Sequence, residues 1–179
     1  MRMGLIALAL AASYAAALAS NSPYRGEENR EIEALNAPQV DGLLRGDGTG
    51  FARTAELDHY PGPRHVLGLA TELELGDSRI ARSEAIFEHM QSEAMRLGRL
   101  LVEGEQMLDR LFREATVSAE TLADRLSALA ETRTRLRGIH LQAHLEQREL
   151  LTPQQLNRYG LERDYLAGRE HAGGHPQYK

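Results

Sequence analysis

The feature that most constrains the fold of this 179-residue chain is a pair of long apolar stripes separated by a short break. In each stripe the residues recur at alternating steps of three and four, which keeps them on one face of an α-helix. The first stripe contains Ile80, Ser83, Phe87, Met90, Ala94, Leu97, Leu101, Gly104, Leu108 and Leu111. The second contains Ala119, Leu122, Leu126, Leu129, Arg133, Leu136, His140, Ala143, Gln147 and Leu150. Two long helices with a short connection predict an antiparallel hairpin.

The boundaries of this hairpin follow from capping residues. The first helix should begin at Asp77, whose side chain can cap it, and end near Ala115, a length of about 50 Å at 1.5 Å per residue. Ser118, backed by acidic Glu120, can cap the second helix. Arg133 is the one charged residue placed in the second stripe; a carboxylate partner across the hairpin, a dimer interface or a kink would each explain it.

Shorter helices are predicted on both sides of the hairpin. Pro63 suits the first position of a helix that continues through His65, Leu69 and Leu73. After the hairpin, Thr152 can cap a last helix, with Pro153 in its first turn and Gln155 reaching back in a capping box.

The two ends of the chain are read separately from this helical domain, residues 63–167. Residues 1–19 resemble a secretory leader, with Arg2 before an apolar run and Ala17-Leu18-Ala19 at the cleavage position, and the run is too short for a membrane span. Residues 20–62 are irregular, with a short helix expected within Glu31–Leu44. Residues 168–179 form a flexible tail that carries His171 and His175, which could hold metal only loosely.

Composition excludes several classes of function. The chain has no cysteine, so it has neither disulfides nor thiolate metal sites, and aromatic residues make up only 5%. Its net charge of −5 argues against a nucleic-acid partner. No nucleophile elbow, zinc-protease helix, phosphate loop or dinucleotide fingerprint occurs, so an enzyme is not expected. An all-α domain remains, and because a lone hairpin leaves apolar surface uncovered, we expect a homodimer, with a monomeric four-helix bundle as the alternative.

Two histidines on the second long helix are candidate metal ligands. His140 and His144 are one helical turn apart, about 6 Å, which suits a transition metal bound through neutral imidazoles. If the chain turns near residue 117, His140 faces Glu93 and His144 faces His89. A fold back at Gly76 would bring His65 level with Phe87 and Glu88. The predicted site is therefore His65, Glu93, His140 and His144, with Glu88 and His89 as further candidates, and zinc, copper, nickel or cobalt as the ion.

The segment Leu151-Thr152-Pro153-Gln154-Gln155, placed after a long helix in a small exported helical protein, resembles the Leu-Thr-x-x-Gln signature of the Spy/CpxP family. This family of periplasmic stress proteins includes the zinc-resistance-associated ZraP and is related to periplasmic metal sensors of the CnrX kind. The resemblance covers roughly residues 63–166 and implies a hooked helical homodimer. Residues 75–79, where members carry a first copy of the motif, lack its threonine and glutamine. Aligned on Leu151, the sensors' last-helix ligands fall on Ala143 and Gln147, so none is carried over.

Three functions follow as expectations. The first is a periplasmic metal-responsive binding protein that protects the envelope or reports metal load. The second, implied by the resemblance, is an ATP-independent holdase that binds unfolded periplasmic proteins on the concave side of a dimer. The third is an adaptor that damps a membrane sensor by contact. The first differs from the others because it requires stoichiometric metal uptake through the histidines.

Overall fold

A computed structural model describes residues 22–27 and 29–163. The predicted leader, residues 1–19, and the histidine-bearing tail, residues 168–179, lie outside the described residues. Within them the elements are helices: α2 (Ala37–Arg45), α3 (Arg53–Leu57), α4 (Pro63–Gly68), α5 (Asp77–Arg113), α6 (Ala119–Leu150) and α7 (Pro153–Glu162). The all-α prediction is confirmed.

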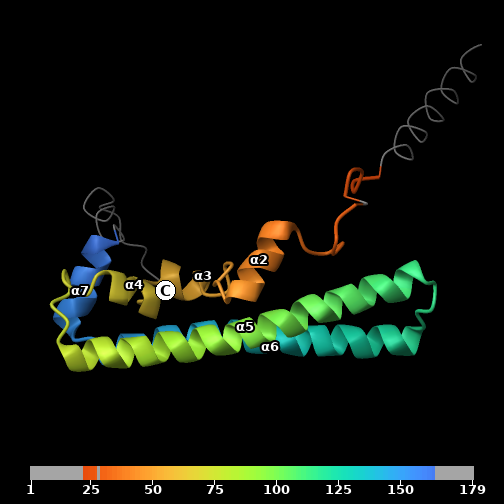
Figure 1. Cartoon of the computed structure of the whole chain (residues 1–179). Coiled ribbons are helices and arrows are strands. Elements are labelled where there is room, and N and C mark those ends of the chain that lie inside the picture. The colour runs from red at the N-terminus through yellow and green to blue at the C-terminus, as the bar shows by residue number, and fades with distance from the viewer. Residues whose placement is uncertain (1–21, 28, 164–179) are drawn as a thin grey trace, which may run out of the picture.

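The two long helices α5 and α6 lie side by side along their length as the predicted antiparallel hairpin (Figure 1). Ser118 caps α6 as expected, because its side chain accepts a hydrogen bond from the Thr121 N–H, and the Thr121 hydroxyl in turn accepts one from the Ser118 N–H. The prediction that Asp77 caps α5 is wrong. Gly76 holds the N-cap position, and Asp77 is the first helical residue, where its charge still favours the helix N-terminus.

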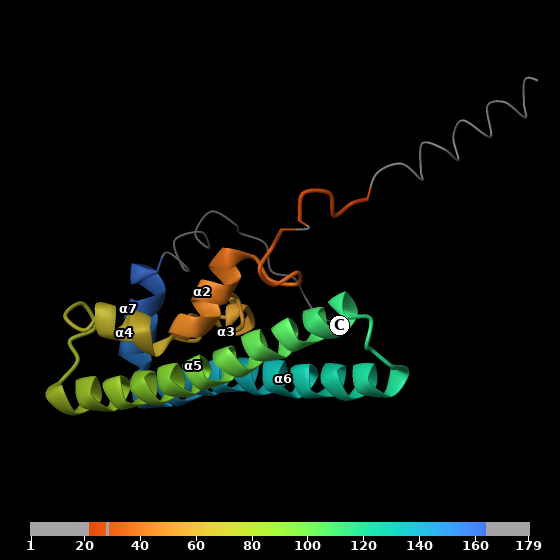
Figure 2. The same cartoon turned by 45° about the vertical axis from the view of Figure 1, so that its right-hand side comes forward.

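A layer of short helices covers one side of the hairpin (Figures 1 and 2). α2 packs on α5, while α4 contacts both long helices. α2 begins later than the sequence suggested, because Asn36 caps it and Pro38 sits in its first turn. α3 was not predicted, and the helix expected from Pro63 to Leu73 ends at Gly68. The layer therefore consists of three short helices, α2, α3 and α4, joined by loops that also lie on the hairpin.

α7 folds back at the base of the hairpin, where its capping box forms as predicted. The Thr152 side chain accepts a hydrogen bond from the Gln155 N–H, and the Gln155 side chain accepts one from the Thr152 N–H. Gln155 Nε2 also donates to the carbonyl of Leu73 at 3.1 Å, which ties α7 to the chain that follows α4. The Leu-Thr-x-x-Gln segment therefore has a structural role in this fold.

Two groups of buried apolar residues hold the layer on the hairpin. One lies under α2 and contains Ile32, Leu35, Leu43, Ala94, Leu97, Leu101, Val102 and Leu136. The other lies at the base of the hairpin and contains Val66, Leu73, Leu75, Leu151 and Tyr159. Between Leu136 of the first group and Leu151 of the second, α6 carries His140 and His144, both buried. The candidate histidines thus lie between the two cores.

No short helix covers the end of the hairpin nearest the turn at residues 114–118 (Figure 2), although α2 packs on Gly98 and the Glu33 N–H donates to Asp109 Oδ2 at 3.0 Å. Stripe residues at the base are buried, among them Ser83, Ala94 and Gln147, but Leu126 is 49% exposed. Arg133 is exposed as well. The predicted stripe is therefore buried over only part of its length.

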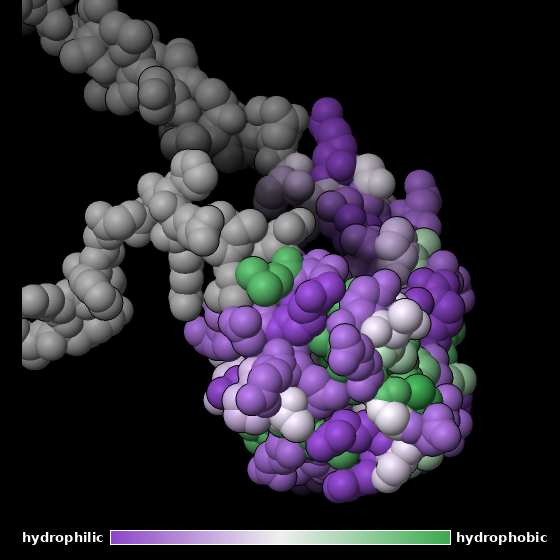
Figure 3. All heavy atoms as spheres, turned by 90° about the vertical axis from the view of Figure 1, so that its left-hand side faces the viewer, coloured by the Kyte–Doolittle hydropathy of each residue, from purple (hydrophilic) through white to green (hydrophobic). Residues whose placement is uncertain are grey.

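The end of the molecule that carries α4 and α7 shows mostly hydrophilic residues, with hydrophobic ones scattered among them (Figure 3). None of the helices in residues 22–163 that the structure describes has both the length and the apolar character needed to cross a membrane.

Candidate metal centre

Three of the four predicted ligands line one cavity of about 240 Å³ between the covering layer and the hairpin. His65 comes from α4, and His140 and His144 come from α6. Phe87 and Met90 of α5 line the same cavity. The sequence predicted that His65 would lie level with Phe87 and Glu88. In the structure Phe87 lines the same cavity as His65, and Glu88 does not.

His144 is held in a single orientation by the loop before α4. Its Nδ1 lies 2.9 Å from the carbonyl oxygen of Tyr60. Because a carbonyl oxygen can only accept a hydrogen bond, Nδ1 carries the proton and donates it. In the singly protonated ring the lone pair is then on Nε2, and a backbone carbonyl holding the opposite ring nitrogen is the arrangement usual for a metal-bound histidine.

Tyr60 is itself fixed by a neighbouring cation. The guanidinium of Arg148 lies 4.6 Å from the centre of the Tyr60 ring, a cation–π contact between α6 and the loop. The loop that bonds His144 is thereby attached to the same helix, one turn further along. This contact helps to keep the Tyr60 carbonyl in place for His144.

His140 is buried, at 2% exposure, and its ring stacks on Phe51 with the centroids 6.0 Å apart. Among the described residues, its Nε2 has no hydrogen-bond partner. A buried polar atom without a partner costs about 1–3 kcal/mol. Burial is the main cause that lowers the pKa of His140, and the neighbouring His144 lowers this pKa further. His140 is therefore a neutral imidazole at pH 7, and its Nε2 forms no hydrogen bond within the described part of the chain.

Gly62 brings His65 and His144 together. A Cβ atom on Gly62 would stand 3.2 Å from His144 Nε2 and 3.5 Å from His65 Nδ1, so both nitrogens lie against this glycine. Burial is the largest cause that lowers the pKa of His65, and Arg163 lowers it further while Glu56 opposes the change. His65 is therefore also neutral at pH 7, the form that binds metals.

The structure does not bring the other predicted ligands to this cavity. Glu93 is partly exposed and pairs with Arg96 of its own helix at 2.8 Å, and this hydrogen bond lowers the pKa of Glu93. Glu88 and His89 are exposed on α5. Glu93, the carboxylate predicted for the site, therefore forms an ion pair with Arg96 and does not line the cavity.

Two carboxylates that the sequence reasoning missed line the cavity instead, Asp47 and Glu56. Asp47 already pairs with Arg45 at 3.0 Å. Glu56 lies close enough to His65 to raise its pKa, against the larger effect of burial. Both come from the segment read as irregular, where no periodic pattern indicated which residues would face the hairpin.

The cavity therefore gathers three imidazoles and two acidic side chains without arranging them around one point. No group of three or more potential ligands within the described residues is already arranged around one point. Two imidazole nitrogens against Gly62 and a third that is buried and unpaired supply the donor types that zinc, copper, nickel and cobalt prefer.

Comparison of the chain with protein-family models, with curated proteins and with solved structures finds no match.

Proposed function

We propose that this protein is an exported, metal-responsive binding protein whose ion is held by His65, His140 and His144. The observation that carries the proposal is His144, because its Nδ1 bonds a backbone carbonyl while its Nε2 lies against Gly62 beside His65. With Nδ1 bonded to the carbonyl, Nε2 of His144 is the nitrogen left to bind an ion. The neutral imidazoles of His65 and His140 line the same cavity.

The donor set favours a borderline divalent transition metal over calcium or magnesium, which prefer oxygen ligands. Glu56 is the carboxylate placed to complete the site, since it lines the cavity and acts on His65. Because the ligands come from α3, α4 and α6, a bound ion would join the covering layer to the hairpin. Metal binding would therefore change how firmly the layer is held, which is a way to report metal load.

Titration of the chelator-stripped protein with Zn²⁺, Co²⁺, Ni²⁺ and Cu²⁺ tests this function by calorimetry. We expect uptake of one ion per chain at pH 7.5, with affinity falling on acidification because protons compete for the imidazoles. The burial of His65 and His140 lowers their pKa values below 6.5, so their share of this fall should begin below pH 6.5. A His171→Ala/His175→Ala variant removes the tail as a source of ligands and should bind equally well. Uptake lost in that variant alone would contradict the proposal.

The variant Gly62→Ala tests the geometry of the site without removing a ligand. The backbone of Gly62, with φ −83° and ψ 141°, suits alanine, but the added methyl group would stand 3.0 Å from His144 Cε1. We expect metal affinity to fall roughly 10–100-fold, the effect typical of disturbing the support of a ligand. Gly68→Ala is the matched control, since nothing lies within 4 Å of its added carbon. Equal affinity of both variants would show that the ion binds elsewhere.

Export and self-association are parts of the same proposal. The leader-like residues 1–19 support export to the periplasm. The exposed apolar residues toward the hairpin turn, Phe112 at 55% and Leu126 at 49%, favour a second copy of the chain as the cover of this surface. Binding of unfolded proteins by the same surface, as a holdase, is the second candidate function.

A further inference from the structure

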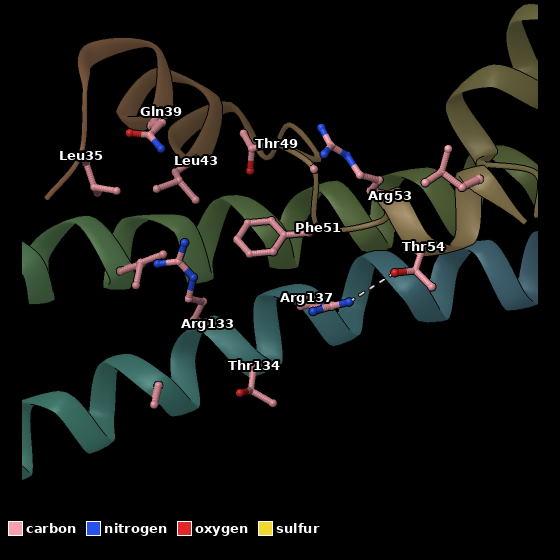
Figure 4. Close-up of a pocket in the computed structure, with 14 residues that line it drawn as sticks. Leu35, Gln39, Leu43, Thr49, Phe51, Arg53, Thr54, Arg133, Thr134 and Arg137 are labelled. Carbon is pink, nitrogen blue, oxygen red and sulfur yellow. Dashed lines mark hydrogen bonds between the residues drawn. The ribbon is translucent and has the colours of Figure 1, made fainter.

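A second, larger cavity lies between α2, α3 and the hairpin. It is a groove of about 710 Å³, within the range of roughly 300–1,000 Å³ usual for small-molecule sites. Leu35 and Leu43 point down into it from the α2 side, and Phe51 enters beside them (Figure 4). With Leu101, which is 1% exposed, they give the groove an apolar floor.

The polar side of this groove is strongly basic. Arg53, Arg133 and Arg137 line it, and no aspartate or glutamate does. Arg133 extends from α6 toward Leu43 and Phe51, while Arg137 lies beside Thr54 (Figure 4). Three guanidinium groups on one groove are unexpected in a chain with 26 acidic residues against 21 basic ones.

These guanidinium groups are largely unpaired in the part of the chain that the structure describes. Arg137 Nη2 donates one long hydrogen bond, 3.5 Å, to the Thr54 hydroxyl, and none of the three forms an ion pair there. Burial raises the pKa of Glu105 and the charge of Arg133 opposes this change, but Glu105 does not line the groove. The groove therefore keeps an excess of positive charge next to apolar surface.

We propose that this groove binds an anionic amphiphile, namely a single-chain alkyl carboxylate. The carboxylate would lie between Arg133 and Arg137, whose planar guanidinium groups match its two oxygens. The alkyl chain would lie along Phe51 and the 69% exposed Leu57, above the buried Leu35, Leu43 and Leu101. This inference does not rest on the metal site, although Arg53 lines both cavities and Phe51 of the groove stacks on His140.

Dodecanoate, used below its micelle-forming concentration and with a chelator present, is the probe for this site. We expect saturable binding by calorimetry, at least about tenfold tighter than that of dodecanol or dodecyltrimethylammonium, which share the chain but lack the negative charge. Arg133→Gln and Arg137→Gln should each weaken dodecanoate binding by a similar factor. Arg135→Gln is the matched control, because Arg135 is exposed on the same helix, pairs with Glu131 and does not line the groove.

Three results would overturn the proposal. Equal binding of dodecanol would show that charge plays no part, and equal weakening by Arg135→Gln would show a diffuse electrostatic effect. A dimer by sedimentation that Arg133→Gln dissociates, without any binding of dodecanoate, would show that a second chain fills the groove. Because the chelator removes metal in every titration, none of these results bears on the metal site.

Discussion

Gly98→Ala should destabilise the protein by a net of about 1 kcal/mol, because α2 rests directly on this glycine of α5. A methyl group at position 98 would meet the backbone carbonyl of Leu43 and lie 2.7 Å from its carbon. That carbonyl also accepts the hydrogen bond from Gly46 that closes the C-terminus of α2, so it cannot move freely. Overpacking of this kind costs typically about 1–3 kcal/mol, which exceeds the roughly 1 kcal/mol that alanine adds to helix propensity.

Urea unfolding followed by circular dichroism measures this effect. Gly138→Ala is the matched control, since it lies exposed on α6 and nothing lies within 4 Å of its added carbon. It should stabilise the protein by about 0.5–1 kcal/mol through helix propensity alone. The two substitutions therefore have opposite expected signs. A stabilising Gly98→Ala would mean that α2 does not pack on the hairpin in solution.

The hairpin could be predicted from sequence because its signal is long and repeated. Two stripes of ten residues fix two helices, and Ser118 and Thr152 add capping signals that depend only on near neighbours. The covering layer could not be predicted to the same extent. α3 has five residues and no side-chain cap, so its place is set by packing and not by local preference.

The candidate site was predicted in part, and the register of the hairpin explains the difference. Near the turn, Leu129 lies against Gly104, as a turn near residue 117 implies. Near the base, the same register would place Gln147 opposite residue 86, but its Nε2 bonds Ser83 at 3.0 Å. This offset of three residues brings Met90, and not Glu93, to the cavity that His140 lines. When the pairing of the two helices is counted outward from the turn over about 30 residues, small differences in helix geometry add up to such an offset.

The histidines were predicted correctly to lie together, because their positions do not depend on the register between α5 and α6. His140 and His144 share one helix, so their spacing holds in any register. His65 reaches them through the layer, where Pro63 fixes the start of α4. Glu56 could not be found in advance, because its position depends on the path of residues 46–62, a segment whose short helix α3 leaves no periodic pattern in the sequence.

His144→Ala should lower the affinity for Zn²⁺ or Co²⁺ by more than 100-fold, above the roughly 10–100-fold range for losing only a supporting partner. The substitution removes the one imidazole whose orientation is fixed, through Tyr60, and whose free nitrogen lies beside His65. His144→Gln gives a second test, because its amide can still donate to the Tyr60 carbonyl and support the fold, yet it provides no imidazole. Both variants should lose the visible absorption of the Co²⁺ complex.

The exposed His89 supplies the control for this experiment. It lies on α5 outside the cavity, so His89→Ala should bind Co²⁺ with the affinity of the parent protein. Apo His144→Gln should keep the helical circular dichroism spectrum of the parent, because the introduced amide can replace the 2.9 Å hydrogen bond to the Tyr60 carbonyl. If folded His144→Gln still takes up one ion with unchanged affinity, imidazoles at this cavity do not hold the metal. The ligands would then lie elsewhere, and an affinity that does not change near pH 6.5 would identify them as carboxylates.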